Sequence, residues 1–383
     1  MSSQRGASLA LLMTALFAGS ALAQDGTPTR VGTIPVPGNP LTSFDISWVD
    51  QVTELYFLAN RSNKSVDIFD AANGTFLRRV EGFAGFTPSP PGVTPPPAGT
   101  GTDFAGPDGV VSTGPTEVWA GDGDSTVKII DLTTNSIVKS ISTNGEKRVD
   151  EMAFNGRDHL LLAANNADTP PFLTLFDTVN RTIVKGKITV SDETGDATGI
   201  EQPAFSNVTG LFYASVPSLG PAPEHGAVAI IDTTGAVIGT IPVDNCSPAG
   251  LAVGPRDHLV VGCAEPVTVV ISANDRKEIA RITEVGGADE VWFNAGDRNY
   301  YIAARTNPDT QGGPGLGVIN AETNTFVALI PTEPGAHSVA ANARNNHVFV
   351  PIDAGKDPDP GCTNGCIAIF SVTDDTKSTV AAQ

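Results

Sequence analysis

Six ionisable side chains recur at one position of a repeating sequence pattern, and residues of these types can bind a cation or transfer protons. Each precedes a short apolar run, as in Asp150-Glu151-Met152-Ala153-Phe154 and Asp289-Glu290-Val291-Trp292-Phe293. The aligned residues are Asp45, Asp108, Asp150, Glu201, Asp289 and His337, with Ala249 at this position in a further copy. Glu151, Gln202 and Glu290 follow one residue later.

Carboxylates gathered around one axis raise one another's pKa unless a cation compensates, which is the arrangement of metal sites and acid/base pairs. Hard carboxylate ligands favour Ca²⁺ or Mg²⁺, and participation of an imidazole favours Zn²⁺ or another transition metal. For catalysis, Glu151, Glu290 and His337 are the candidate bases or proton donors, and Arg305 is the candidate cation for an anionic substrate group. The predicted ligands of a divalent metal ion are Asp45, Glu151, Glu201, Asp289 and His337.

Each of these side chains also has a structural interpretation. An Asp at the start of a strand commonly hydrogen-bonds its own backbone. Arg305 could equally form a salt bridge to Asp289 or Glu290. For His225, in a long loop beside Glu224, a solvated loop residue is the favoured interpretation. The recurrence of the acidic position is therefore stronger evidence for a site than any one of its members.

The elements that position these residues are short β-strands. Apolar runs such as Val127-Lys128-Ile129-Ile130-Asp131 alternate with tight turns such as Thr134-Asn135 and Asn73-Gly74. Runs of β-branched residues between such turns predict antiparallel hairpins. Four runs in each of seven repeats of roughly 40 to 50 residues predict an all-β, seven-bladed β-propeller with four-stranded antiparallel blades. Helix should be scarce, since no sustained period of 3.6 occurs.

The last repeat ends after three strands, near residues 367–372. The missing strand is available at the other end of the chain, because residues 30–36 (RVGTIPV) match the fourth-strand pattern of residues 237–243 (VIGTIPV). We therefore expect the N-terminal strand to close the ring and to remove its exposed edges.

In an antiparallel blade, the connection between blades and the loop from the second to the third strand emerge on the same face. The long segments all fall there: the Pro/Gly-rich inter-blade loop 83–107 and the loops 165–171, 217–226, 305–315 and 353–365. Because binding surfaces are built from long loops on a rigid scaffold, this face should carry the site. The acidic positions lie on the same face.

Export is predicted by residues 1–23, in which Arg5, an apolar core and Ala21-Leu22-Ala23 form a signal peptide. Residues 24–383 are then a single secreted or periplasmic propeller domain. Four cysteines are expected to pair locally as Cys246–Cys263 and Cys362–Cys366, with metal ligation by the second pair as the less favoured alternative. The formal charge of −19 argues against nucleic acid and anionic membranes as partners, and the chain is expected to be a monomer.

The Val-X-Ile-X-Asp strand followed by a Thr-Asn turn, as in residues 127–135, resembles the YncE-like family of secreted seven-bladed β-propellers. The resemblance covers nearly the whole mature chain and implies the fold. More distant propellers, the gluconolactonase and streptogramin lyase groups, hold Ca²⁺, Zn²⁺ or Mg²⁺ in the channel. The resemblance to them implies that Glu151, Glu201, Asp289 and His337 are compatible with such a site.

The expected function is metal-assisted hydrolysis, of the lactonase or esterase type, or lyase chemistry on a small oxygenated organic molecule. A non-catalytic binding scaffold for a protein, peptide or glycan is the alternative, and a quinone-dependent redox enzyme is a third. The last would need a basic, aromatic-lined pocket.

Overall fold

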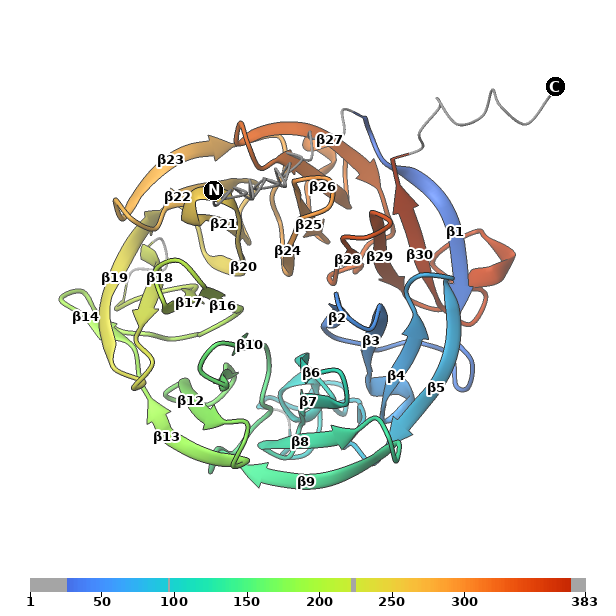
Figure 1. The fold of residues 1–383 in the computed structure, drawn as a ribbon, viewed down its shortest axis with the longest axis horizontal. Coiled ribbons are helices and arrows are strands. Elements are labelled where there is room, and N and C mark those ends of the chain that lie inside the picture. Colours follow the sequence, from blue (N-terminus) through green and yellow to red (C-terminus); the bar gives the residue numbers. More distant parts are fainter. Residues whose placement is uncertain (1–25, 96, 222–224, 373–383) are drawn as a thin grey trace, which may run out of the picture.

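The computed structural model describes residues 26–95, 97–221 and 225–372, which form seven four-stranded antiparallel sheets around a central axis (Figure 1). The seven-bladed β-propeller predicted from the sequence is therefore confirmed. Only short 3-10 helices interrupt the strands in this part of the chain. No helix among the described residues is long and apolar enough to cross a membrane. The predicted signal peptide, residues 1–23, and Glu224 lie outside the described residues.

Each of the first six blades is a simple meander, with its strands in chain order from the axis outwards. The strands of blades 1 to 3 are β2 (Ser47–Asp50), β3 (Leu55–Asn60), β4 (Ser65–Asp70), β5 (Thr75–Glu81), β6 (Val110–Gly114), β7 (Glu117–Gly121), β8 (Thr126–Asp131), β9 (Ser136–Ser142), β10 (Met152–Asn155), β11 (Leu160–Asn165), β12 (Phe172–Asp177) and β13 (Thr182–Ile188). Those of blades 4 to 6 are β16 (Pro203–Ser206), β17 (Leu211–Val216), β18 (His225–Ile231), β19 (Val237–Asp244), β20 (Pro248–Val253), β21 (His258–Cys263), β22 (Thr268–Ser272), β23 (Lys277–Ile282), β24 (Val291–Asn294), β25 (Asn299–Ala304), β26 (Gly315–Asn320) and β27 (Thr325–Pro331).

Blade 7 joins the two ends of the chain, as the sequence predicts. It contains β28 (Ala340–Asn342), β29 (His347–Ile352), β30 (Cys366–Ser371) and, as its outer strand, β1 (Thr29–Pro35). β1 pairs antiparallel with β30, with Thr33 opposite Ala368. Closure leaves no blade without its fourth strand.

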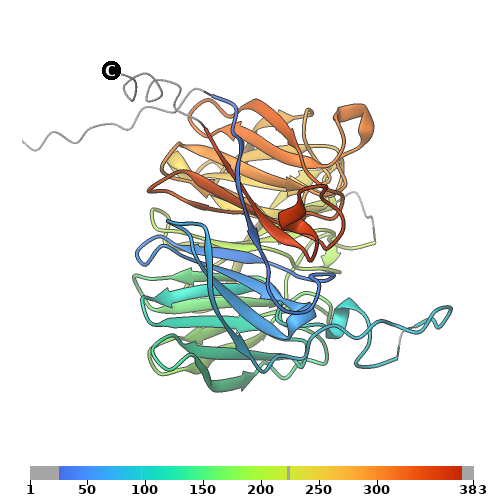
Figure 2. The ribbon, with the colours of Figure 1, turned by 90° about the vertical axis from the view of Figure 1, so that its right-hand side faces the viewer.

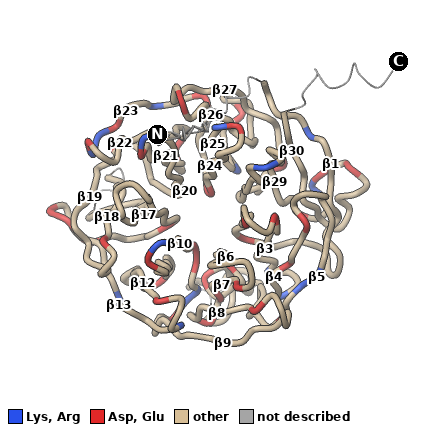
Figure 3. The backbone as a smooth tube through the Cα atoms, viewed as in Figure 1, with Lys and Arg blue, Asp and Glu red and all other residues tan. Residues whose placement is uncertain are grey.

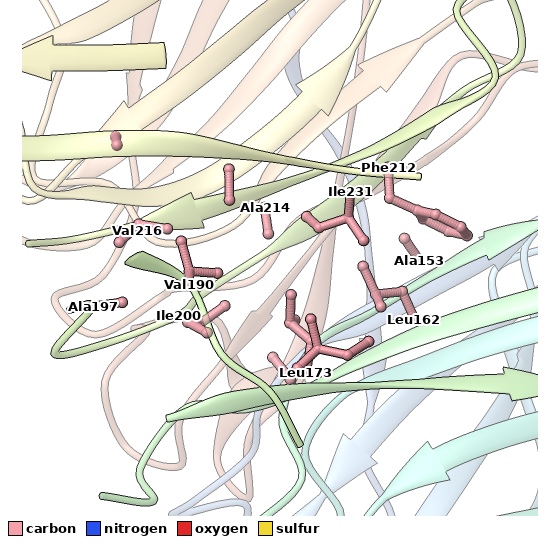
Figure 4. Packing of buried hydrophobic residues seen from close by; sticks show 14 of the residues in the cluster. Ala153, Leu162, Leu173, Val190, Ala197, Ile200, Phe212, Ala214, Val216 and Ile231 are labelled. Carbon is pink, nitrogen blue, oxygen red and sulfur yellow. The ribbon is translucent and has the colours of Figure 1, made fainter. Parts of the chain in front are cut away.

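The hydrophobic core consists of separate clusters in which the facing sheets of neighbouring blades pack. Between blades 3 and 4, Leu162 and Leu173 meet Phe212 and Ile231, and all four side chains are buried (Figure 4). Truncating such a Phe to Ala typically costs about 3–5 kcal/mol. This dry packing fixes the blades relative to one another and so fixes the inner strands around the axis.

The long connections gather on one face of the ring, where the loop 83–107 extends away from the blades (Figure 2). This loop contains the 3-10 helix η2 (Thr102–Phe104). A small hairpin of β14 (Ser191–Asp192) and β15 (Gly195–Asp196), which the sequence patterns did not predict, lies in the connection between blades 3 and 4. The remaining 3-10 helices are η1 (Arg61–Asn63), η3 (Pro255–Asp257), η4 (Asp309–Gln311) and η5 (Pro360–Cys362).

Both predicted disulfides are present, Cys246–Cys263 and Cys362–Cys366. Disulfides persist in oxidising compartments, so they indicate a non-cytoplasmic environment. The alternative of metal ligation by Cys362 and Cys366 does not hold in this structure, because their sulfur atoms are bonded to each other.

Candidate active site at the channel mouth

The acidic residues predicted to form a ring all stand two residues before an inner strand. Their backbone N–H groups donate equivalent hydrogen bonds to carbonyls near the end of the adjacent second strand. The donor and acceptor pairs are Asp45–Ala59 (2.9 Å), Asp108–Gly121 (3.0 Å), Asp150–Ala164 (2.7 Å), Glu201–Ser215 (2.9 Å) and Asp289–Ala303 (3.1 Å). The repeat alignment is thus correct, and it places these carboxylates on the long-loop face. Figure 3 shows acidic and basic segments together near the axis beside β10.

A second ring position, the residue that directly follows the second strand of each blade, faces the first. It is occupied by Arg61, Asp122, Asn166, Pro217, Ala264, Arg305 and Asp353. Five of these seven, all except Asp122 and Asn166, line a cavity at the channel mouth together with the acidic ring except Asp108. The cavity has a volume of about 550 Å³ and is called the upper pocket below. Its size suits a small organic molecule.

Arg61 forms ion pairs with two aspartates from different blades. Its guanidinium donates a hydrogen bond of 2.5 Å to Asp45 at the start of blade 1 and a second one, through Nε, of 2.7 Å to Asp108 at the start of blade 2. The three side chains are nearly inaccessible to solvent, at 5%, 9% and 0% exposure respectively. A charge buried to this extent is stable only when paired, so Arg61 is the cation on which both carboxylates depend.

Arg148 forms the corresponding ion pair with the aspartate at the start of blade 3. Its guanidinium pairs with Asp150 at 2.7 Å, and its backbone N–H donates to the carbonyl of Asp103 in η2 at 2.8 Å. Lys147 adds an ion pair with the Asp103 side chain at 2.8 Å. The inter-blade loop 83–107 is therefore tied to the rim of the upper pocket, and Thr102 lines it.

Arg305 pairs with Asp289 at 2.6 Å, one of the two salt bridges that the sequence left open. The side chain of Arg305 remains 43% exposed, in contrast to the buried Arg61. A substrate anion can therefore reach Arg305 from solvent, as its predicted orienting role requires.

His337 is held in one orientation by three neighbours. Its ring stacks on Phe44 with centroids 4.5 Å apart, its Nδ1 lies 2.6 Å from the carbonyl of Gly335, and its Nε2 lies 3.4 Å from Asp45. Burial by itself lowers the pKa of an imidazole, but the hydrogen bond to Asp45 and the charge of Asp289 outweigh burial and raise the pKa of His337. In the opposite sense, Arg61 and His337 hold the pKa of Asp45 below its ordinary value, although burial opposes them.

Within the described part of the chain, Glu151 and Glu201 form no salt bridge, unlike the aspartates Asp45, Asp108, Asp150 and Asp289. Glu201 accepts a hydrogen bond of 3.2 Å from the Asn166 amide. One carboxylate oxygen of Glu151 is buried without a hydrogen-bond partner among the described residues. Unsatisfied buried polar atoms are rare in native proteins and call for a functional explanation.

Both glutamates hold their proton more tightly than a solvated carboxyl group does. Burial raises the pKa of Glu201 to about 7, and the neighbouring Asp289 carboxylate acts in the same direction. Burial also raises the pKa of Glu151 well above its ordinary value, with repulsion from Asp150 and Asp289 added. A carboxyl group that titrates near neutral pH is suited to general acid or base catalysis.

Glu290 and Gln202 face the neighbouring blades and do not line the upper pocket. One oxygen of Glu290 accepts hydrogen bonds from the Ser338 hydroxyl at 2.6 Å and the Val339 backbone at 2.9 Å. The Gln202 amide oxygen accepts from the backbone N–H of Leu251 at 2.6 Å and of Val291 at 3.1 Å. These contacts cross-link the inner strands of different blades.

Blade 5 contributes an uncharged wall to the upper pocket. Blade 5 has Ala249 at the ring position that is acidic in most other blades. Pro248, Ala264 and Ser247 line the pocket beside it. The Ser247 hydroxyl is bound to Glu265 at 2.8 Å. The pocket therefore presents charges on one side and small, mostly apolar groups on the other.

The predicted metal ligands line the upper pocket, but two of the five already form salt bridges with arginines. Asp45 and Asp289 are paired with Arg61 and Arg305. Among the described residues, the one group of three candidate ligand side chains within 4.8 Å of one another is Asp357, Cys362 and Cys366, at the outer edge of blade 7. Two of those three atoms are the sulfurs of a disulfide.

Two functional residues were missed by the sequence reasoning, Arg61 and Arg148. Arg61 occupies the same position after the second strand as Arg305 does in its own repeat, so the alignment that located the acidic ring could have found it. Arg148 lies in an inter-blade connection with no equivalent in the other repeats, and no repeat signal marks it. His225, half exposed and 3.8 Å from Asp244, lies outside the upper pocket.

Comparison with known proteins supports the fold alone. No family model matches the chain, and no curated protein does. Among solved structures, 1706 chains are similar, which marks the architecture as widespread and uninformative about activity. One is a chain of the "Crystal Structure of Mitotic Checkpoint Complex", with 12% sequence identity, a TM-score of 0.64, and coverage of 96% of this chain and 99% of that chain. At that identity the likeness establishes the seven-bladed propeller and nothing finer.

Proposed function

We propose that this protein is an exported enzyme that binds a small oxygenated organic molecule in the upper pocket and acts on it by hydrolysis or elimination. The observation that carries the proposal is that two glutamates of the inner ring, Glu151 and Glu201, line a cavity of about 550 Å³ without an arginine partner among the described residues. Either reaction needs a group that transfers a proton near neutral pH, and Glu201 is the best suited.

The other residues of the upper pocket have distinct roles in this proposal. Arg305, which is open to solvent, binds an anionic oxygen of the substrate. The unpartnered Glu151 oxygen accepts a hydrogen bond from a substrate hydroxyl. His337 positions the Asp45 carboxylate. The uncharged wall from blade 5 accommodates the carbon skeleton of the substrate. The buried Arg61 and the partly buried Arg148 hold the aspartates in place.

A divalent cation is the second form of this proposal, and Glu151 and Glu201 are the residues that would bind it first. Both lack a salt bridge, whereas Asp45 and Asp289 would have to exchange an arginine for the metal ion. The cation would polarise a substrate oxygen or a water molecule. His337 and Asp289 complete the ligand set if those exchanges occur.

The test is a screen for turnover of lactones, esters and hydroxy acids by protein prepared without metal, with and without added Mg²⁺, Ca²⁺ or Zn²⁺. Glu201→Gln should lower turnover at least about 100-fold, as expected for loss of a general acid or base. The exposed Glu193→Gln is the matched control and should retain full turnover. Turnover that survives in Glu201→Gln contradicts the catalytic role. Activity only with metal, and metal content lost in Glu151→Gln, selects the second form.

A non-catalytic binding site is the competing function, and one observation favours it. The aspartates Asp45, Asp108, Asp150 and Asp289 are already paired with arginines, so the pocket is ordered without a reacting partner. Mixed charges around a cavity also suit recognition of a glycan or peptide terminus. Tight binding without turnover, unchanged in Glu201→Gln, would select this function.

A further inference from the structure

A second cavity occupies the lower half of the channel, beyond Glu151 from the upper pocket. It has a volume of about 220 Å³ and is lined by the inner strands of blades 1 to 6. We call it the lower chamber. Glu151 and Ile46 line both cavities, so they mark the boundary between the two. By volume the lower chamber holds on the order of seven water molecules, enough for a compact ligand.

Aromatic rings dominate the walls of the lower chamber. Trp48 comes from blade 1, Phe154 from blade 3, Phe205 from blade 4, and Trp292 and Phe293 from blade 6. All five side chains are only partly buried. Each ring packs in part against the core between blades, and each also lines the channel.

The two tryptophans meet across blade 7. Their rings are 5.0 Å apart in an edge-to-face arrangement with an interplanar angle of 70°. The inner strand of blade 7 carries Ala340 and Ala341, and these small residues leave the space that the indoles occupy. Trp48 is also fixed by a hydrogen bond of 2.9 Å from its Nε1 to Ser112. The aromatic wall is therefore pre-organised.

The charged residues of the lower chamber are both acidic. Glu151 and Glu290 line it at 5% and 1% exposure, and none of its lining residues is Lys or Arg. Glu151 contributes the buried oxygen without a partner. The upper pocket differs, because Arg61, Arg148 and Arg305 line it. Aromatic faces attract a cation through their quadrupole. Burial raises the pKa of Glu151, and an ammonium ion beside it opposes that shift by favouring the ionised form. The carboxylate is then a directed partner for the N–H groups of the cation.

We infer that the lower chamber is a binding site for a compact organic ammonium ion, whose hydrocarbon part lies among the aromatic rings and whose N–H groups face Glu151. An organic anion is disfavoured because no basic side chain lines the chamber. A neutral molecule of the same shape gains the aromatic contacts but lacks the cation–π attraction. The site goes beyond the activity proposed for the upper pocket and does not require it.

Intrinsic fluorescence tests this inference, because two of the three tryptophans in the chain lie in the lower chamber. The third, Trp119, is fully buried away from the channel. The full mature protein is titrated at pH 7 with benzylamine, benzyl alcohol and benzoate, which share a ring and differ in charge. We expect benzylamine to change the fluorescence and to bind at least 10-fold more tightly than benzyl alcohol, and benzoate not to bind.

Variants test whether the ligand binds in the lower chamber. Glu151→Gln, which keeps the side-chain shape, should remove the preference for the amine over the alcohol. Trp119→Phe should keep the fluorescence change, and Trp48→Phe combined with Trp292→Phe should abolish it. Equal affinity for alcohol and amine, a fluorescence change with benzoate that requires the two channel tryptophans, or no binding of benzylamine would each overturn the inference. A fluorescence change that persists without both channel tryptophans would also overturn it.

Discussion

The two halves of the central channel are built on the same inner strands but differ in chemistry. The upper pocket is lined by residues that precede these strands, and three arginines from loops reach the carboxylates there. The lower chamber is lined mainly by residues within the strands, which include all five of its aromatic side chains. Position along the inner strand therefore decides between a charged site and an aromatic one.

The difference has a simple energetic basis. Aspartates at the channel mouth can be buried because Arg61, Arg148 and Arg305 lie close enough to pair with them. No cation lines the lower half, so large apolar rings fill that space and Glu290 is satisfied by neutral hydrogen bonds. Glu151 lies at the boundary, and one of its carboxylate oxygens has no hydrogen-bond partner among the described residues of either half.

The largest expected effect comes from removing the cation of the upper half. Arg61→Ala leaves Asp108 buried without its salt bridge and leaves Asp45 with His337 alone, so it should lower the free energy of unfolding by about 3–5 kcal/mol. The control is Arg157→Ala, whose salt bridge to Asp158 is exposed at 56% and 39%, and which should cost at most about 1 kcal/mol. Denaturant unfolding measures both variants. Equal costs for the two would show that the buried ion pairs do not support the channel.

The next effect sharpens the role of Glu201 through pH. Because its pKa is raised from 4.5 to about 7, the folded protein binds this proton more tightly than the unfolded chain does. Its contribution is fully present below pH 4.5 and is lost as the pH rises to about 7, by up to about 3 kcal/mol. The raised pKa of His337 acts in the same direction.

Unfolding free energies measured at intervals from pH 5 to pH 8 should therefore fall with rising pH, and the slope should be shallower in Glu201→Gln. The exposed Glu193→Gln should keep the slope of the unmodified protein. An identical slope in Glu201→Gln would show that the pKa of Glu201 is that of an ordinary glutamate.

The smallest effect belongs to the lower half. Phe154→Leu exchanges one partly buried apolar side chain for another and should cost less than about 1.5 kcal/mol. It should leave ligand binding in the upper pocket unchanged, because Phe154 lines only the lower chamber. Isothermal titration with an upper-pocket ligand checks this separation. A large loss of affinity would mean that the two halves act as one site.

The fold followed from local patterns. Seven alignable repeats, the match between residues 30–36 and 237–243, and the cysteine spacings each reflect contacts that recur or close over short distances. The structure confirms the blade count, the closure of β1 onto β30 and both disulfides. The register of the acidic ring followed from the same patterns, because one backbone hydrogen bond repeats in each of these blades.

The chemistry of the site followed only in part. The sequence located the carboxylates, but which of them are neutralised depends on arginines from other segments, such as Arg61, which pairs with the next blade. Glu290, a candidate catalytic residue from the sequence, accepts hydrogen bonds from Ser338 and Val339 and does not line the upper pocket. The aromatic chamber was not predicted, although its phenylalanines recur as the third residue of β10, β16 and β24 and its tryptophans as the second residue of β2 and β24. The repeat pattern does not show which of these side chains turn towards the channel.

The most direct test of the account is the titration of Glu201 itself. Carboxyl carbons of the folded protein, labelled with ¹³C at glutamate, are followed by NMR from pH 4 to pH 9, and Glu201 is assigned by comparison with Glu201→Gln. The account predicts a carboxyl resonance that titrates near pH 7 and is absent from the variant. If the resonance lost in the variant titrates below about pH 5, in the ordinary range of a glutamate, the upper pocket lacks its acid/base group.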